Sequence, residues 1–372
     1  MKILHIAFSA FILCSQIAIG QDNNIHLEGR LIDEGNQKPI EYASIVVAGT
    51  STGSACNDEG IFALSIPHKF ASYRIRISCI GYMSRSFSID SLSKVGNLVL
   101  ALSPDKTILD EITIASTISG PAEILDEALN SIPRNYCRQP FNLDLYSTIT
   151  NYDSIRKSSY KLETILLGYY EGYFPNASKK FKILEKRENG IDPLESVDYT
   201  YWPSNELYSV DLITDQASRG IFNRENWDKF RFERQDISIY DDDTVFVITY
   251  DLPKPTTKIT GYGITPNYYR GRIFIAHRNY AIVRHTLETS SFTYDIIYKK
   301  IDKYYFPYLI RGDRENIFKL GGKRRSFRNT NLIIVKDIRL TDIEKIDPKE
   351  DEWHVTKIKY NKTYWDLNHP AN

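Results

Sequence analysis

Residues 39–67 read PIEYASIVVAGTSTGSACNDEGIFALSIP, and residues 73–82 continue with YRIRISCIGY. Short apolar runs alternate here with turn residues. The β-branched run at residues 43–47 suits a strand packed against a core. Gly49 and Gly53 bound a segment that allows a tight reversal. Short strands at this spacing, with turns between them, predict a small antiparallel β-sandwich.

Five segments of this region follow, in order, the pattern of a known family. The region resembles the carboxypeptidase-regulatory-like domain, a transthyretin-like β-sandwich, over residues 25–115. The resemblance implies a sandwich fold and an accessory domain without chemistry of its own. The matching segments are residues 29–33, 39–45, 49–53, 58–62 and 77–82.

The chain opens with the features of a secretory signal peptide. Lys2 precedes an apolar run at residues 3–14, and the small residues Ala18 and Gly20 follow it. We expect cleavage after Gly20, and hence an exported protein of the periplasm or outer membrane. The apolar run is too short for a retained anchor. An alternative treats Cys14 as the lipid acceptor of a lipoprotein, although the preceding residue is bulky.

The charges of the chain balance. Lys plus Arg and Asp plus Glu each number 47, so the formal net charge is zero. The balance predicts neither a nucleic-acid partner nor an anionic-membrane footprint for the chain as a whole. Aromatic residues make up 13% of the chain, including 26 Tyr, which fits β-rich packing or a binding surface.

Three cysteines remain once the signal peptide is removed. An oxidising compartment would allow one disulfide, for which Cys56 and Cys79 are the candidates. The alternative, separate buried thiols that act as small apolar residues, is the more frequent arrangement. The third cysteine, Cys137, has no local nucleophile signature.

The chain divides into a signal peptide at 1–20, the sandwich at 21–115, a linker and helix at 116–134, and a β domain at 135–372. Residues 109–115 are predicted to add a last strand to the sandwich. Pro121 is well placed in the first turn of the helix, and Pro133 is expected to end it. Its apolar face is expected to contain Ile124, Leu125, Ala128, Leu129 and Ile132.

The second domain is predicted to be a series of hairpins without alternating helices. This pattern argues for one large antiparallel sheet, curved or closed. The fold class is therefore mostly β, a transthyretin-like sandwich followed by a curved, half-barrel-like antiparallel sheet with one or a few helices. The predicted strands are residues 143–149, 161–174, 230–240, 244–250, 272–276, 280–288, 304–311, 331–343 and 354–360. The pattern of residues 161–174 also fits a helix, and a strand is favoured.

One hairpin carries a second resemblance. Residues 269–275 (YRGRIFI) and 279–284 (NYAIVR) are similar to a hairpin of LolA-like half-barrels. That resemblance implies a curved sheet that carries lipoprotein acyl chains across the periplasm. With Trp365 near the end, the domain also resembles the tail that follows regulatory-like sandwiches in Gram-negative envelope proteins.

The sequence contains no pattern that predicts a catalytic or metal site. His285 and Glu288 have the His-x-x-Glu spacing of a zinc site, but a strand would place them on opposite faces. The acidic residues 241–243 could hold Ca²⁺, although a solvated hairpin turn is the more ordinary role. No Gly-x-Ser-x-Gly or phosphate-binding loop occurs. We expect no catalytic residue, no metal and no cofactor.

Four aromatic residues could line a binding concavity: Tyr169, Tyr170, Tyr173 and Phe174. Core or interface packing is the alternative role for the same side chains. They are the only binding candidates that the sequence offers.

The sequence favours a non-enzymatic cell-envelope protein. Its β domain would bind a lipid or other apolar ligand, or an outer-membrane protein partner, by burial in a preformed concavity without a cofactor. One alternative is a small outer-membrane β-barrel with a periplasmic sandwich. The charged residues among 181–188 and the absence of a terminal aromatic residue argue against it. A second alternative is a hydrolase with an unrecognised site.

Overall fold

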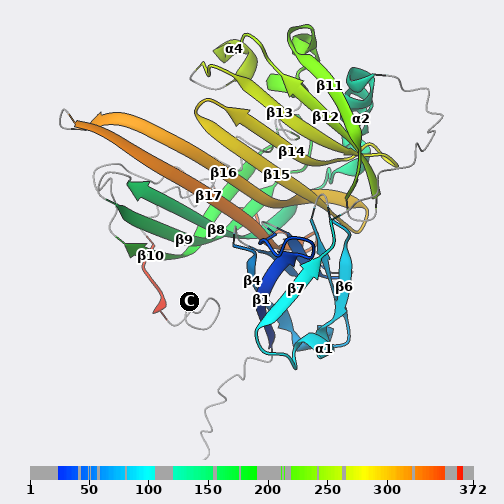
Figure 1. Ribbon diagram of the computed structural model, residues 1–372, viewed down its shortest axis with the longest axis vertical. Helices are drawn as coiled ribbons and strands as arrows, with labels where there is room; N and C mark the ends of the chain where they lie inside the picture. Colours follow the sequence, from blue (N-terminus) through cyan, green and yellow to red (C-terminus); the bar gives the residue numbers. More distant parts are fainter. Residues whose placement is uncertain are drawn as a thin grey trace, which may run out of the picture.

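The computed structural model describes residues 24–40, 43–48, 50, 52–56, 59–79, 82–104, 120–153, 157–175, 177–190, 211, 213, 219–240, 243–261, 265–320, 323–347 and 358–362. The elements form a small two-sheet unit and a large curved sheet, each with its own hydrophobic core (Figure 1). Among the described residues, no helix is long and apolar enough to cross a membrane.

The N-terminal unit is a sandwich, as predicted. One sheet has the strand order β4-β1-β7 and the other β3-β2-β5-β6. Alternation puts Phe62, Leu64 and Ile66 of one strand into the shared core, because every second side chain of a strand points the same way. The elements are β1 (Asn24–Asp33), β2 (Ser44–Val47), β3 (Gly53–Ala55), β4 (Ile61–Pro67), η1 (His68–Phe70), β5 (Arg74–Ser78), β6 (Arg85–Ser88), α1 (Ile89–Leu92) and β7 (Leu98–Leu102).

The sandwich is not wholly antiparallel, which corrects the prediction. β1 and β7 run parallel, from the pair Gly29–Leu98 to the pair Asp33–Leu102. An alternating pattern tells which residues share a face but not which way a neighbour runs, so the sequence could not show this. The backbones approach so closely that a Cβ at Gly29 would collide with Leu98.

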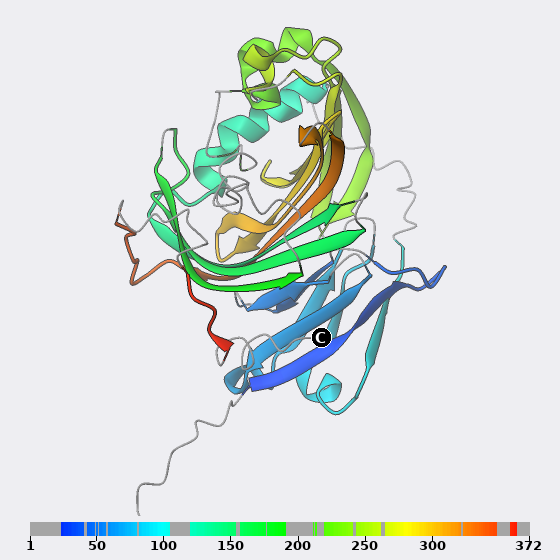
Figure 2. The ribbon, with the colours of Figure 1, turned by 90° about the vertical axis from the view of Figure 1, so that its left-hand side faces the viewer.

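The C-terminal unit is one ten-stranded antiparallel sheet, ordered β10-β9-β8-β17-β16-β15-β14-β13-β12-β11. β10 and β11 follow each other in sequence but form the two opposite edges, so the sheet is curved and open (Figure 2). The strands are β8 (Phe141–Asp153), β9 (Ser158–Tyr170), β10 (Lys179–Gly190), β11 (Arg231–Tyr240), β12 (Asp243–Asp251), β13 (Tyr269–Ala276), β14 (Ile282–Thr289), β15 (Phe292–Ile301), β16 (Tyr304–Leu320) and β17 (Lys323–Arg339).

Several strands differ from the predicted ones. The sequence does not predict β10 or β15. β16 and β17 extend well into the polar, charged segment between the predicted strands 304–311 and 331–343. The predicted strand at residues 109–115 and most of the one at 354–360 lie outside the described residues. So do the signal segment 1–20, Trp365, residues 241–242 and the side chain of Asp243.

Helix α2 (Pro121–Asn135) lies inside the curve of the sheet (Figure 2). Its predicted apolar face is buried in the large core. The prediction that Pro133 ends the helix is wrong, because Pro133 lies within its last turn. The helix continues to Asn135, because Pro in the final turn removes a single backbone hydrogen bond.

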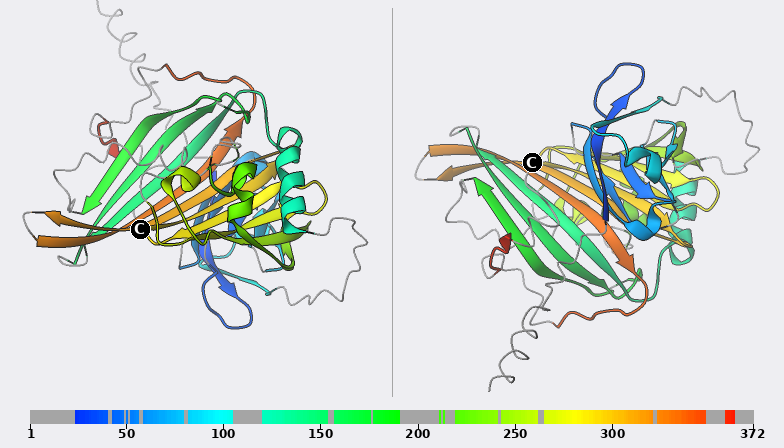
Figure 3. Two further views of the ribbon diagram at one scale, coloured as in Figure 1. Left: turned by 90° about the horizontal axis from the view of Figure 1, so that it is seen from above. Right: turned by 90° about the horizontal axis from the view of Figure 1, so that it is seen from below.

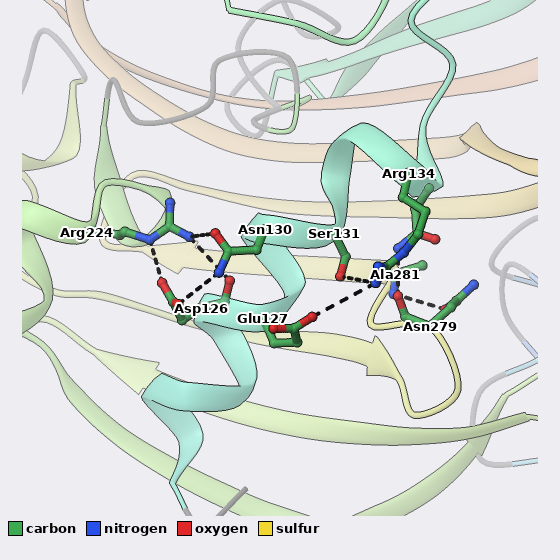
Figure 4. A network of polar contacts seen from close by, with 9 residues as sticks. Asp126, Glu127, Asn130, Ser131, Arg134, Arg224, Asn279 and Ala281 are labelled. Carbon is green, nitrogen blue, oxygen red and sulfur yellow. Dashed lines mark hydrogen bonds and ion pairs between the residues drawn. The ribbon is translucent and has the colours of Figure 1, made fainter.

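Polar contacts fix α2 to its surroundings (Figure 4). Arg224 donates from Nε to Asp126 Oδ1 at 2.5 Å and from Nη2 to Asn130 Oδ1 at 2.7 Å. This joins the helix to η3 (Arg224–Lys229), which follows η2 (Gly220–Phe222). At the other end, Asn135 Nδ2 donates to the Asn279 carbonyl at 2.8 Å, in the turn between β13 and β14. A further short helix, α4 (Thr257–Thr260), follows β12.

The two units touch through few contacts. The Tyr308 hydroxyl on β16 donates to the Ser54 carbonyl of the sandwich. Lys299 Nζ donates to Ser44 Oγ at 3.4 Å, and the side chain of Val46 belongs to the large core. Strands β2 and β3 of the sandwich therefore face the large sheet.

The three described cysteines, Cys56, Cys79 and Cys137, form no disulfide. The buried Cys56 thiol donates to the Ile40 carbonyl at 2.9 Å and accepts from the Ala43 amide at 3.1 Å. Of the two alternatives that the sequence leaves open, the structure has separate thiols.

Candidate ligand-binding face

The concave face of the large sheet is apolar on one side and polar on the other. Residues paired directly across an antiparallel sheet share a face, so one row of side chains can be followed over all ten strands. His285 in this row contacts Phe222 of η2, which identifies the row as concave. From β11 to β10 it consists of Arg234, Ile248, Ile273, His285, Ile296, Ile310, Ile333, Ser147, Thr164 and Lys186.

The row is apolar over most of β12–β17 and polar over β8–β10. In the rows beside it, on the same face, Asn331 of β17 lies opposite Ile149, and Asn329 lies opposite Asn151. These polar residues form a diagonal across β9, β8 and β17, which we call the polar track. The polar track consists of Ser147, Asn151, Thr164, Asn329 and Asn331.

The polar track is buried, and several of its groups have unmet hydrogen bonds. Its five side chains are at most 3% exposed. Asn329 Nδ2 donates to Asn151 Oδ1 at 2.5 Å. Four atoms have no hydrogen-bond partner among the described residues: Ser147 Oγ, Asn151 Nδ2, Thr164 Oγ1 and Asn331 Oδ1. Each such group costs about 1–3 kcal/mol when left unsatisfied, so the track is set to bond to something else.

Apolar side chains border the polar track along the strands. Toward the start of β8 come two rows of buried apolar residues, and within the track Ile149, which lies between Ser147 and Asn151, pairs with Leu162. The concave face of β8–β10 therefore offers an apolar strip of about two rows, next to a patch of hydroxyl and amide groups. The two rows contain Leu143, Leu145, Leu166, Phe181 and Ile183.

A buried acid lies at the far end of this strip. Asp211 is fully buried and accepts a hydrogen bond from the Tyr298 hydroxyl at 2.8 Å. Lys179 Nζ on β10 lies 4.0 Å from Asp211 Oδ2. Burial raises the pKa of Asp211, while Lys179 and then Tyr298 act in the opposite direction.

The four predicted aromatic residues separate into two groups. Tyr170 and Tyr173 are fully buried on the concave side, and both stack on Phe141, with ring centroids 4.9 and 5.7 Å away. Tyr169 lies on the opposite face in a small cluster with Leu167 and Ile346. Phe174 is half-buried after β9.

Tyr170 and Tyr173 thus pack in the core near Asp211. Burial and the nearby Asp211 hold the pKa of Tyr173 well above its usual range, so its hydroxyl stays neutral. Direct contact of these aromatic residues with a ligand stays a prediction. The structure adds the polar track, which sequence analysis missed.

The His-x-x-Glu pair is split across the sheet, as the strand pattern predicted. His285 is buried, and its Nε2 lies 2.8 Å from the Tyr250 hydroxyl. Glu288 is on the other face, paired with Arg270 at 2.8 Å. Within the described part of the chain, no group of three or more His, Cys, Asp and Glu residues is placed to hold a metal ion.

The sequence contains only a weak signal of the polar track. Ser147, Ile149 and Asn151 alternate within one strand, as do Asn329 and Asn331 in another. Alternation shows that such residues share a face, but a polar side chain is normally assigned to the solvent side. Only the strand pairing shows that these faces meet on the concave side of the sheet.

Comparison with known proteins gives one family match. Residues 27–114 match the model of the CarboxypepD_reg-like domain. No curated protein matches the chain. The family match agrees with the resemblance that the sequence motifs show for residues 25–115.

Several solved structures are similar to this chain in fold. A domain from Vibrio parahaemolyticus described as an outer membrane lipoprotein-sorting protein is 13% identical, with a TM-score of 0.28, and 59% of this chain covers 94% of it. A DUF1329 family protein from Desulfovibrio piger is 11% identical, with a TM-score of 0.30, at coverages of 64% and 98%. The Mycobacterium tuberculosis lipoprotein LppX is 9% identical, with a TM-score of 0.22, at coverages of 61% and 100%.

The first of these structures is of the lipoprotein-sorting kind that the hairpin at residues 269–284 resembles. At TM-scores this low the likenesses carry no argument about function, which rests on the residues of this chain. The family match covers the β-sandwich, so this chain joins a CarboxypepD_reg-like domain at residues 27–114 to an open ten-stranded sheet that carries the polar track.

Proposed function

We propose that this protein is a non-enzymatic binding protein of the cell envelope, and that the concave face of β8–β10 and β17 holds an elongated amphipathic ligand. The ligand's apolar part lies along the rows of Leu143, Leu145 and Leu166. Its polar part, an ester, amide or hydroxyl group, bonds to the polar track. A lipid with an acyl chain fits this description.

The observation that carries the proposal is the set of four unmet polar atoms. A packed core rarely leaves several neighbouring hydroxyl and amide groups unsatisfied. The apolar strip beside them supplies a hydrophobic surface, and the polar groups would fix the orientation of the ligand, as in ligand sites generally. A wholly apolar ligand would leave these groups unmet, so an amphipathic one is favoured.

The test combines native mass spectrometry with two double variants. Residues 21–372 purified from an envelope fraction are expected to carry a lipid-sized mass. After removal of that lipid, the protein is titrated with 11-dansyl-undecanoic acid. Ser147→Ala with Thr164→Val removes two track groups, and we expect roughly 10- to 30-fold weaker binding because two hydrogen bonds are lost.

The matched control lies on the same strand. Thr148 and Thr150 alternate with the track residues and are on the opposite, convex face. Thr148→Val with Thr150→Val should bind the probe as the wild type does. Absence of both an adduct and probe binding would overturn the proposal and leave docking of an outer-membrane protein in its place. Equal probe binding by the track variant and the wild type would show that the polar track does not bind the ligand.

A further inference from the structure

Arg314 of β16 extends the polar track by a positive charge. Strand pairing places Arg314 opposite Asn329, and Asn329 opposite Asn151, so the three side chains share the concave face. Their strands lie side by side in the sheet, as the view from above also shows (Figure 3). The hydroxyl and amide groups of the track are therefore followed, on β16, by a guanidinium group.

Two aromatic residues of β15 hold the Arg314 side chain on this face. Its guanidinium carbon lies 5.6 Å from the centroid of the Phe292 ring, and Nη2 donates to the Tyr294 hydroxyl at 3.5 Å. Phe292 and Tyr294 are buried, whereas Arg314 is half-buried. The guanidinium is thus oriented before a ligand arrives, which lowers the conformational entropy that binding would cost.

A glycine lies between the polar track and the Tyr294 hydroxyl. Gly312 of β16 is paired with Asn331 on one side and with Tyr294 on the other. It contributes no side chain to the face, where the strands of Asn331 and Tyr294 are about 9–10 Å apart, or two strand spacings. A ligand that bonds to the track can therefore reach the guanidinium over β15 without crossing a side chain of β16 in this row.

We propose that the ligand of the concave face is an acyl lipid with a phosphate group, and that Arg314 binds the phosphate. The proposal rests on the proposed function and specifies the polar end of its ligand. An ester group of the lipid bonds to the polar track, and the phosphate lies about 10 Å away, at the guanidinium and the Tyr294 hydroxyl. A guanidinium donates to two oxygens of one phosphate at once, and a neutral headgroup offers no such charged pair of acceptors.

The test compares two competitors that differ only in the phosphate, 1-palmitoyl lysophosphatidic acid and 1-palmitoylglycerol. Each displaces 11-dansyl-undecanoic acid from the lipid-free protein, and the ratio of their affinities does not depend on the affinity of the probe. We expect the wild type to favour the phosphate lipid by roughly 10- to 100-fold, because hydrogen bonds to a charged group are stronger than neutral ones. Arg314→Gln should abolish this preference and leave the affinity for 1-palmitoylglycerol unchanged.

Arg328→Gln is the matched control. Arg328 is on the neighbouring strand β17 but on the opposite face, where it is paired with Asp313 at 2.7 Å, and its replacement changes the net charge equally. This variant should keep the wild-type preference, and Arg314→Lys, which retains the charge, should keep part of it. Equal loss of both lipids in Arg314→Gln would show that Arg314 only supports the sheet, and would overturn the proposal.

The remaining outcomes separate this proposal from the proposed function. Equal affinities of the wild type for the two lipids would overturn the phosphate site and leave the concave face as a lipid site. Binding of neither lipid nor probe would overturn both proposals. Displacement of the phosphate lipid by inorganic phosphate would show a site for free phosphate instead.

A second cation borders the polar track at its other end. Lys186 of β10 is opposite Thr164 and lies 2.7 Å from Glu188. Lys186→Gln should keep the preference for the phosphate lipid. Loss of the preference in Lys186→Gln but not in Arg314→Gln would place the phosphate at β10 and overturn its assignment to Arg314.

Discussion

At the residue scale, His285 shows what burial does to a titratable side chain. Its ring is enclosed by Phe222 and Tyr250, and burial lowers the pKa of His285 from 6.5 to about 3. The native protein therefore keeps a neutral imidazole at pH values where the unfolded chain is already protonated. Stability that is complete above pH 6.5 is lost as the pH falls from about 6.5 to about 3.

We predict that wild type and His285→Gln differ in how the free energy of unfolding depends on pH. Between pH 6 and pH 4 the wild type should lose up to about 1.4 kcal/mol per pH unit more than the variant, because one proton binds only on unfolding. Urea unfolding at several pH values measures this. Tyr250→Phe, which keeps the imidazole, should retain the wild-type slope. Parallel curves for wild type and His285→Gln would contradict the prediction.

Single residues also show which features the sequence can predict and which it cannot. Alternation correctly placed His285 and Glu288 on opposite faces of the sheet. It could not identify Asp211, because the burial of a lone aspartate depends on which distant side chains surround it. Lys179 and Tyr298, which contact Asp211, lie on strands that the sequence did not predict.

At the element scale, β12, β13 and β14 are packed too closely for a side chain at one position. A Cβ at Gly271 would collide with the Tyr250 hydroxyl and the Thr286 carbonyl. We predict that Gly271→Ala lowers the free energy of unfolding by about 2–3 kcal/mol, because a strand or a buried tyrosine must move. Chemical denaturation measures the change.

Gly96 provides the matched control for this substitution. No atom lies within 4 Å of a Cβ placed there. Gly96→Ala should change stability by less than about 0.5 kcal/mol, the range of ordinary surface substitutions. Similar costs at both positions would mean that the close approach at Gly271 is not the cause.

Element prediction succeeded where apolar alternation was strong. Helix α2 and the strands β12 to β14 have buried faces that repeat regularly, so their positions were found. β10 was missed because its second half, Glu185–Gly190, is charged and polar. The outer part of the β16–β17 hairpin was missed for the same reason. Its backbone is satisfied by the partner strand, although its composition is that of a loop.

At the scale of the whole molecule, two hydrophobic cores are joined by a few contacts near Tyr308. We predict two unfolding transitions in differential scanning calorimetry, one for each core. Ile45→Ala in the sandwich and Ile248→Ala in the large sheet should each destabilise its own core by about 2–5 kcal/mol and lower one transition only. A single transition that both variants shift equally would contradict the prediction and the domain division at residues 115–135.

The strand order also determines when the molecule can finish folding. β8 is the first strand of the large sheet along the chain, and its neighbour β17 is the last, about 200 residues later. Until β17 is available, β8–β10 and β11–β16 are separate sheets, and β8 and β16 are additional unpaired edges. Closing so long a loop is slow. Because the chain is synthesised from its N-terminus, the sandwich is completed early. The polar track, which needs β8, β9 and β17, assembles only at the end of synthesis, so a truncated chain would have the accessory domain without the binding face.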